Sequence, residues 1–221
     1  MTDLHTHSLF SDGVLLPSEL IQRARKTGYT AIAITDHADS SNIEFVLNGL
    51  KKVCADSNKA YNDIKCIPGV ELTHIPPVLV KAMVLKARKL GAKIVVFHGE
   101  TVVEPVEPGS NRAAIEAGVD ILAHPGRISA EECVLAAKNG VHLEITARNG
   151  HNITNRHVAA AARAAGALLV FDTDTHGPGN LADDKMRDKV LKDAGLSKEE
   201  IKSAIANSEN IVKRIFSGGK K

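Results

Sequence analysis

Aromatic side chains are scarce in this chain of 221 residues. It contains no tryptophan, two tyrosines and five phenylalanines, so that aromatic residues make up 3% of the sequence. Proteins that hold long single-stranded nucleic acids need aromatic rings on which successive bases can stack. The composition therefore argues against a long single strand as the ligand.

An excess of charge of one sign is also lacking. The chain has 28 basic and 26 acidic residues, a formal net charge of +2, and no run of more than two like charges, the last of these pairs being Lys220 and Lys221. Proteins that bind duplex nucleic acid or anionic membranes concentrate basic residues on one face or segment. We find no clear nucleic-acid footprint, and we expect no membrane partner.

Cysteines and long apolar runs are few. Cys54, Cys66 and Cys133 are odd in number and have no C-x-x-C spacing, which favours reduced thiols packed as small apolar groups over disulfides or a zinc knuckle. No secretory signal pattern and no apolar run of roughly 18 residues is present. The prediction is a cytoplasmic protein.

What the chain does contain is a repeated alternation of short apolar runs with longer amphipathic runs, most of which end at a glycine. We predict strands at residues 3–5, 30–35, 64–70, 92–97, 119–123, 141–145 and 167–171. We predict helices at residues 17–26, 44–56, 77–90, 111–117, 130–139 and 155–165, with two or three more between 181 and 216. Such βα units form parallel sheets, either as a closed barrel or as an open doubly wound sheet. We expect one domain over residues 1–216 and a disordered tail at 217–221.

Imidazoles and carboxylates follow six of the seven predicted strands, and only the sixth strand lacks a candidate. They are His5 and His7, Asp36 and His37, Glu71, His98, His124, and Asp174 and His176. In a βα barrel the carboxyl ends of all strands meet at one face, so these side chains would form a single cluster. So many ligands without cations would leave uncompensated charge and lone pairs, which predicts a metal centre with several ions. Mixed imidazole and carboxylate donors without thiolates suit Zn, Mn or Fe.

The segments that carry these residues resemble, in this order, the motifs of the PHP (polymerase and histidinol phosphatase) superfamily. They read "DLHTHSLFSDG", "ITDH", "GVE", "VVFHGE", "AHPG" and "TDTH", and the resemblance extends over about residues 3 to 180. It implies an α/β fold, a distorted (β/α)7 TIM-like barrel with extra C-terminal helices, and three divalent metal ions. The implied ligands are His5, His7, Glu71 and Asp174 for the first ion, Glu71, His98 and His124 for the second, and Asp12, His37 and His176 for the third.

The resemblance implies a metal-dependent phosphatase or phosphodiesterase, similar to histidinol-phosphate phosphatases. Three divalent ions against the carboxylates of Asp12, Glu71 and Asp174 leave a charge of about +3, which attracts a phosphate dianion. Two cations roughly 3.5 to 4 Å apart acidify a water between them. The predicted nucleophile is therefore a metal-bridging hydroxide and not a side chain, and the predicted substrate is a small anionic phosphorylated metabolite.

Other residues near the strand ends are candidates for supporting roles. Four of them lie in loops on the rim where the strands end: Arg148, Arg127, His151 and His74. Each is either a substrate ligand or a surface or supporting residue. Asp36 is expected to orient a ligand imidazole. Asp172 either orients an imidazole in the same way or has a structural role. Glu100 is either a proton donor or part of its loop. His142 and His157 fall inside a strand and a helix and are interpreted as structural.

Two alternative functions stay open. One is a PHP-type nuclease that acts on short oligonucleotides. The other is a non-catalytic scaffold like the ribonuclease P subunit that resembles this fold, although such relatives lose metal ligands and this chain has all nine. The oligomeric state and the side chain that protonates the leaving group cannot be derived from the sequence.

Overall fold

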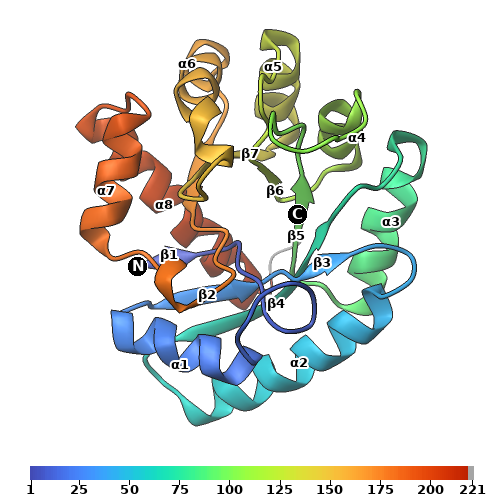
Figure 1. Ribbon diagram of the computed structural model, residues 1–221, viewed down its shortest axis with the longest axis vertical. Coiled ribbons are helices and arrows are strands. Elements are labelled where there is room, and N and C mark those ends of the chain that lie inside the picture. Colours follow the sequence, from blue (N-terminus) through green and yellow to red (C-terminus); the bar gives the residue numbers. More distant parts are fainter. Residues whose placement is uncertain (219–221) are drawn as a thin grey trace.

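The computed structural model describes residues 1–218, whose strands all run parallel in one sheet that curls into a barrel (Figure 1). The strands are β1 (Thr2–Asp3), β2 (Ala31–Ile34), β4 (Lys65–Leu72), β5 (Ile94–His98), β6 (Ile121–Ala123), β7 (His142–Thr146) and β8 (Leu169–Asp172), which neighbour one another in this order, and β3 (His37–Ala38), which pairs with β4. The predicted barrel is confirmed, and the open doubly wound sheet is not the fold.

Eight α-helices lie outside the strands (Figure 1). They are α1 (Pro17–Thr27), α2 (Ile43–Ala60), α3 (Pro77–Leu90), α4 (Ser110–Ala117), α5 (Ala130–Asn139), α6 (Asn155–Ala165), α7 (Asp184–Asp193) and α8 (Lys198–Phe216), with 3-10 turns η1 (His151–Thr154) and η2 (Pro178–Asn180). Five of the first six end at a glycine with positive φ, for example Gly28 after α1 and Gly166 after α6. Glycine takes this left-handed conformation without steric cost, which is why it locates these ends correctly.

Each predicted strand differs from the observed one by at most two residues at either end, and the largest differences at the carboxyl ends are in the first and third strands. β1 covers only residues 2 and 3, and the next residue bonds to a side chain: Leu4 N donates to Asp172 Oδ1 at 2.6 Å. The third predicted strand, β4, extends to Leu72, so Glu71 lies within the strand and not after it. The two-residue β3 was not expected from the sequence.

The barrel closes at a seam between the N-terminal segment and the segment that follows β8. His7 N donates to Thr175 O at 2.8 Å, and Asp174 N donates to His5 O at 2.9 Å. The Asp3 carboxylate accepts from Thr173 N at 3.2 Å and from Thr173 Oγ1 at 2.6 Å. Side chains thus replace part of the ladder that two long strands would supply.

Two hydrophobic cores fix the barrel. The larger core lies between the helices and the sheet, and the smaller one fills the barrel interior with side chains such as Leu4, Ile67 and Val96. Helix α8 adds Ile211 to the interior core, and Arg214 Nη2 on the same helix contacts Asp120 Oδ1 at 2.7 Å. The interior is therefore packed, which leaves the carboxyl ends of the strands as the place for a site.

The C-terminal tail is described only in part. Ser217 and Gly218 form an exposed turn after α8, and the rest of the predicted tail, residues 219–221, lies outside the described residues. Within residues 1–218, no helix combines the length and the apolar character that crossing a membrane requires.

Candidate metal centre

The nine predicted ligands meet at the carboxyl end of the barrel. They come from the segment after β1 (His5, His7, Asp12), from β3 (His37), β4 (Glu71) and β5 (His98), and from the segments after β6 (His124) and β8 (Asp174, His176). Six of them are buried, whereas His37 and His176 are half-buried and Asp12 is exposed. Residues separated by most of the chain are thus neighbours in one cluster.

Four of these side chains place donor atoms at the separations of a tetrahedral ion site. His5 Nε2 lies 3.1 Å from His7 Nε2 and 3.3 Å from Glu71 Oε2. Asp174 Oδ1 lies 3.1 Å from His7 Nε2 and 3.7 Å from His5 Nε2. A tetrahedral ion bound at about 2.1 Å requires donors about 3.4 Å apart. The group therefore has the dimensions of an ion site.

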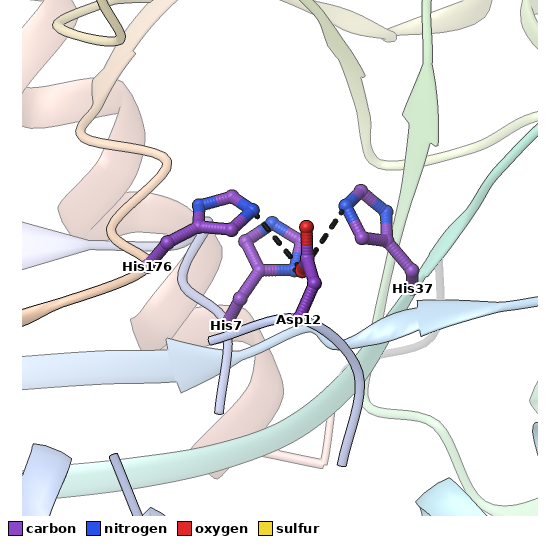
Figure 2. A group of neighbouring side chains, drawn as sticks. All are labelled: His7, Asp12, His37 and His176. Atoms are coloured by element: carbon purple, nitrogen blue, oxygen red, sulfur yellow. Dashed lines mark ion pairs between the residues drawn. The ribbon is translucent and has the colours of Figure 1, made fainter. Parts of the chain in front are cut away.

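A second group forms around the Asp12 carboxylate, as Figure 2 shows. The imidazoles of His176 and His37 approach Asp12 Oδ1 from opposite sides, with their Nε2 atoms at 3.1 and 3.5 Å. His7 lies beside them, its Nδ1 at 4.0 Å from the same oxygen. These donors lie within 4.8 Å of one another, close enough for one ion.

The third group shares Glu71 with the first. His124 Nε2 lies 3.5 Å from Glu71 Oε1, and the donor atoms of Glu71, His98 and His124 lie within 4.8 Å of one another. Because Glu71 directs Oε2 toward His5 and Oε1 toward His124, its carboxylate lies between two groups of donors.

Buried donor atoms without hydrogen bonds support the fit to cations. Among residues 1–218, both carboxylate oxygens of Glu71, Asp174 Oδ1 and the Nδ1 atoms of His7, His98 and His124 are buried and form no well-aligned hydrogen bond. Buried polar atoms are almost always paired, so a group of unpaired ones in one cluster needs an explanation. Divalent cations satisfy lone pairs of this kind, so the residues present fit the metal ions.

The charges of the cluster also support a fit to cations. Burial opposes charge on His5, but the carboxylates of Glu71, Glu144 and Asp174 outweigh it and raise the pKa of His5 well above its usual value. Burial likewise opposes charge on Glu71, but the nearby His5 and His37 hold the pKa of this carboxyl well below its usual range. Without metal, protons on imidazoles such as those of His5 and His37 balance the carboxylates, and divalent cations can replace these protons.

The sequence interpretation missed Glu144, which lies within β7, the one strand without a predicted candidate. Its fully buried carboxylate accepts from His5 Nδ1 at 2.7 Å and from His124 N at 2.9 Å. A carboxylate can only accept, so Nδ1 of His5 carries the proton and Nε2 keeps its lone pair for an ion. Nothing in an apolar strand pattern signals this role.

Asp36 corrects another expectation. It was predicted to orient a ligand imidazole, but its carboxylate accepts from Ser8 N at 2.7 Å, Ser8 Oγ at 2.6 Å and Ser11 Oγ at 2.7 Å. The reason is that the chain after His7 turns back over β2 and exposes its donors to Asp36. Asp36 therefore fixes the loop that carries Asp12.

The interpretations left open for two other carboxylates are resolved by their contacts. Glu100 Oε1 accepts from Gly109 N at 3.0 Å and from Asn111 N at 2.9 Å, so Glu100 organises its loop. The Asp172 carboxylate accepts from Leu4 N, so it closes the barrel seam and does not orient an imidazole.

Of the four rim candidates for substrate binding, two reach the cluster, Arg148 and His151, and Arg127 does not. Arg148 Nε lies 3.9 Å from Asp174 Oδ2, and the ring of His151 lies 4.3 Å from that of His124. Arg127 is exposed on the loop after β6 and forms no ion pair or hydrogen bond with residues 1–218. His157 bonds to the Ile128 carbonyl at 2.7 Å, away from the cluster.

Glu104 is a second residue that the sequence did not reveal. It lies in the loop between β5 and α4, where its Oε2 is 3.1 Å from His98 Nε2 and its Oε1 is 3.4 Å from His151 Nε2. The hydrogen bond and the positive charge of His98 lower the pKa of Glu104 to about 2, against the opposing effect of burial. Because Glu104 is six residues past His98, no strand-end rule selects it.

Comparison with known proteins gives one family. The PHP domain pattern matches residues 3–155. An uncharacterized protein of Methanocaldococcus jannaschii is 48% identical over 215 residues, which cover 96% of this chain and 99% of that protein. A probable phosphatase of Shewanella pealeana is 26% identical over 91% of this chain and 87% of its own length.

Two solved structures share the fold. One is a histidinol phosphate phosphatase from Lactococcus lactis in complex with zinc, L-histidinol and phosphate, which has a TM-score of 0.60 and 18% identity and covers 89% of this chain and 94% of its own. The other is a chain of archaeal ribonuclease P with mature tRNA, which has a TM-score of 0.72 and 17% identity over 97% of this chain and 91% of its own.

Proposed function

The chain belongs to the PHP domain family and is a metal-dependent phosphoester hydrolase, and from this premise we propose that it removes phosphate from a small phosphorylated metabolite. The proposal includes three divalent ions, of Zn, Mn or Fe, held by the nine residues of the cluster. The observation that carries it is the spacing of the donors of His5, His7, Glu71 and Asp174, which matches that of an ion site.

The proposed division of the ligands follows the three groups of donors. His5, His7, Glu71 and Asp174 would hold the first ion, Glu71, His98 and His124 the second, and Asp12, His37 and His176 the third. Divalent ions bound there supply Lewis acidity to the phosphoester and make water a stronger nucleophile near neutral pH.

The surrounding side chains position the substrate and the ligands. Arg148 is half-buried and extends to the edge of the cluster, so its guanidinium is placed to bind phosphate oxygens. His151 donates or accepts at Thr101 Oγ1, 2.9 Å from its Nδ1, and this contact directs its other nitrogen toward the cluster. Arg127, exposed on the rim, would bind only the part of a substrate that extends beyond the cluster.

Two alternative functions use the same fold. A nuclease for short oligonucleotides would use the same ion sites, whereas a scaffold like the ribonuclease P chain would need none of them. The complete set of buried donors supports an enzyme, because buried imidazoles and carboxylates without a function are costly to retain.

The test is hydrolysis of p-nitrophenyl phosphate, bis-p-nitrophenyl phosphate and a single-stranded oligonucleotide, each with added Mn²⁺ or Zn²⁺. We expect turnover of the monoester, and a drop of more than about 100-fold in His124→Gln, since even supporting residues of metal sites typically account for 10–100-fold. His157→Gln is the matched control, because His157 bonds to a backbone carbonyl away from the cluster. Oligonucleotide cleavage alone would establish the nuclease, and absence of both bound metal and turnover would establish the scaffold.

A further inference from the structure

A cavity of about 190 Å³ lies beside the metal cluster, between the loop after β3 and the first turns of α3. Its lining is mainly apolar, with Ile75, Leu79, Ala82 and Met83 along the wall, and with His74 at its edge. Pockets of this kind, apolar with a few polar groups, are typical of small-molecule sites. Nothing in the proposed metal centre uses this cavity.

His74 has a strained backbone, which points to a function for this residue. Among residues 1–218, only three residues other than glycine have positive φ: His74 at 52°, His124 at 28° and Asp174 at 52°. The other two are predicted metal ligands. Strain of this kind costs about 1–3 kcal/mol and is concentrated at functional sites. His74 is the one strained residue to which the metal centre gives no role.

The imidazole of His74 lies between the cavity and the centre. Its ring centroid is 5.2 Å from that of His98, and its Nε2 is 3.7 Å from Glu104 Oε2. About half of its side chain is exposed, so one face is free to contact a ligand. A substrate whose phosphate lies at the ions can therefore extend past His74 into the cavity.

We propose that His74 and this cavity bind the leaving group of the substrate, and that they select phosphomonoesters of compact, largely apolar alcohols. This inference rests on the proposed function. The cavity is small, about 190 Å³, and its wall is mainly aliphatic, so it suits a compact apolar group such as a single ring or a short branched chain. The Asp39 carboxylate at the cavity wall disfavours a second anionic group on the leaving alcohol.

The experiment narrows the cavity without touching the ligands. Ala82 is exposed and lines the cavity, so the longer side chain of Ala82→Leu would narrow it, whereas Ala206→Leu makes the same change at an exposed position on α8 away from the cavity. We expect kcat/KM for phenyl phosphate to fall about tenfold or more in Ala82→Leu, since one or a few methylene groups in a pocket change selectivity by 10–200-fold. Inhibition by inorganic phosphate, which reports on the centre alone, should stay unchanged, and Ala206→Leu should match the wild type.

A second variant tests His74 itself. Glycine adopts positive φ without strain, so His74→Gly should unfold at the same or a higher temperature while kcat/KM for phenyl phosphate falls at least fivefold. A structural role would lower the unfolding temperature and leave kcat/KM unaffected. Unchanged inhibition by inorganic phosphate would again show that the metal centre is intact.

The outcomes separate this inference from the proposed function. Two results in Ala82→Leu would overturn the leaving-group site but not the proposed phosphatase. One is an equal loss of phenyl phosphate turnover and of inhibition by phosphate, and the other is no change in either. A wild-type protein that binds metal and inorganic phosphate but hydrolyses no phosphomonoester would overturn the proposed function and this inference with it.

Discussion

Replacing Glu144 by glutamine should weaken metal binding although Glu144 is not among the nine proposed ligands. The carboxylate accepts two hydrogen bonds, from His5 Nδ1 at 2.7 Å and from His124 N at 2.9 Å. Glutamine keeps the shape but offers one acceptor and one donor group. In Glu144→Gln the amide NH₂ therefore faces one of the two donors. If it faces His124 N, two N–H groups oppose each other. If it faces His5 Nδ1, His5 must carry its proton on Nε2, where the proton blocks the ion.

The magnitude follows from this loss of orientation. Removing a carboxylate that fixes a ligand imidazole typically costs 10–100-fold in metal affinity. Each factor of ten is about 1.4 kcal/mol, so at saturating metal the bound ion should stabilise Glu144→Gln by about 1.4 to 2.7 kcal/mol less than it stabilises the wild type. The quantity to compare is the increment, that is, the unfolding free energy with metal minus that without metal, because the substitution also changes the stability of the metal-free protein.

The measurement is chemical unfolding with and without Zn²⁺ or Mn²⁺, together with competition against a chelator of known affinity. Glu116→Gln, at an exposed carboxylate on α4, is the matched control and should leave the increment unchanged. If Glu144→Gln bound metal as tightly as the wild type, the hydrogen bond at His5 Nδ1 would not be what prepares Nε2 of this imidazole to bind an ion.

Three further predictions follow from other contacts. Burial opposes charge on His37, but the carboxylates of Glu71 and Asp12 outweigh it and raise the pKa of His37 to about 9. Protonation of His37 therefore stabilises the metal-free fold fully below about pH 6.5. The unfolding free energy should decline as the pH rises from about 6.5 through about 9. In Gly126→Ala the new Cβ would lie 1.8 Å from the Glu100 carbonyl oxygen at φ +62°, so we expect a loss of about 3 kcal/mol or more in denaturant titration; near-wild-type stability would show that this loop yields easily. Burial raises the pKa of the Cys66 thiol to about 11, so a thiol reagent at pH 7 should label it only on unfolding, and rapid labelling of the native protein would contradict its buried position.

Most of the fold and the nine clustered residues could be predicted because both follow from local patterns. Glycine marks the ends of helices by its conformational freedom, as at Gly91 after α3, whose predicted bounds match the structure. The ends of buried parallel strands meet at one face, so polar residues placed there, such as His98 and His124, are neighbours whatever their separation in sequence.

The residues that were missed or misassigned depend on tertiary contacts. Glu144 occupies the middle of a buried strand, where its partner His5 is known only once the segment after β1 closes beside β8, the neighbour of β7. Glu104 reaches His98 through the path of an irregular loop, and Asp36 finds its donors on a turn that no periodicity describes. Each of these carboxylates is identified by what it contacts and not by its position along a strand.

The seam of the barrel makes the centre depend on the order in which the chain is synthesised. Leu4 and Asp172, which bond across it, are 168 residues apart, and His5, His7, Asp174 and His176 lie on its two sides. A ribosome that adds about 5–20 residues per second needs roughly 8 to 34 seconds to cover that distance. During this interval the segment after β1, with His5 and His7, lacks its partners on the other side of the seam. Closure of the barrel and assembly of the proposed first ion site therefore occur together, late in synthesis.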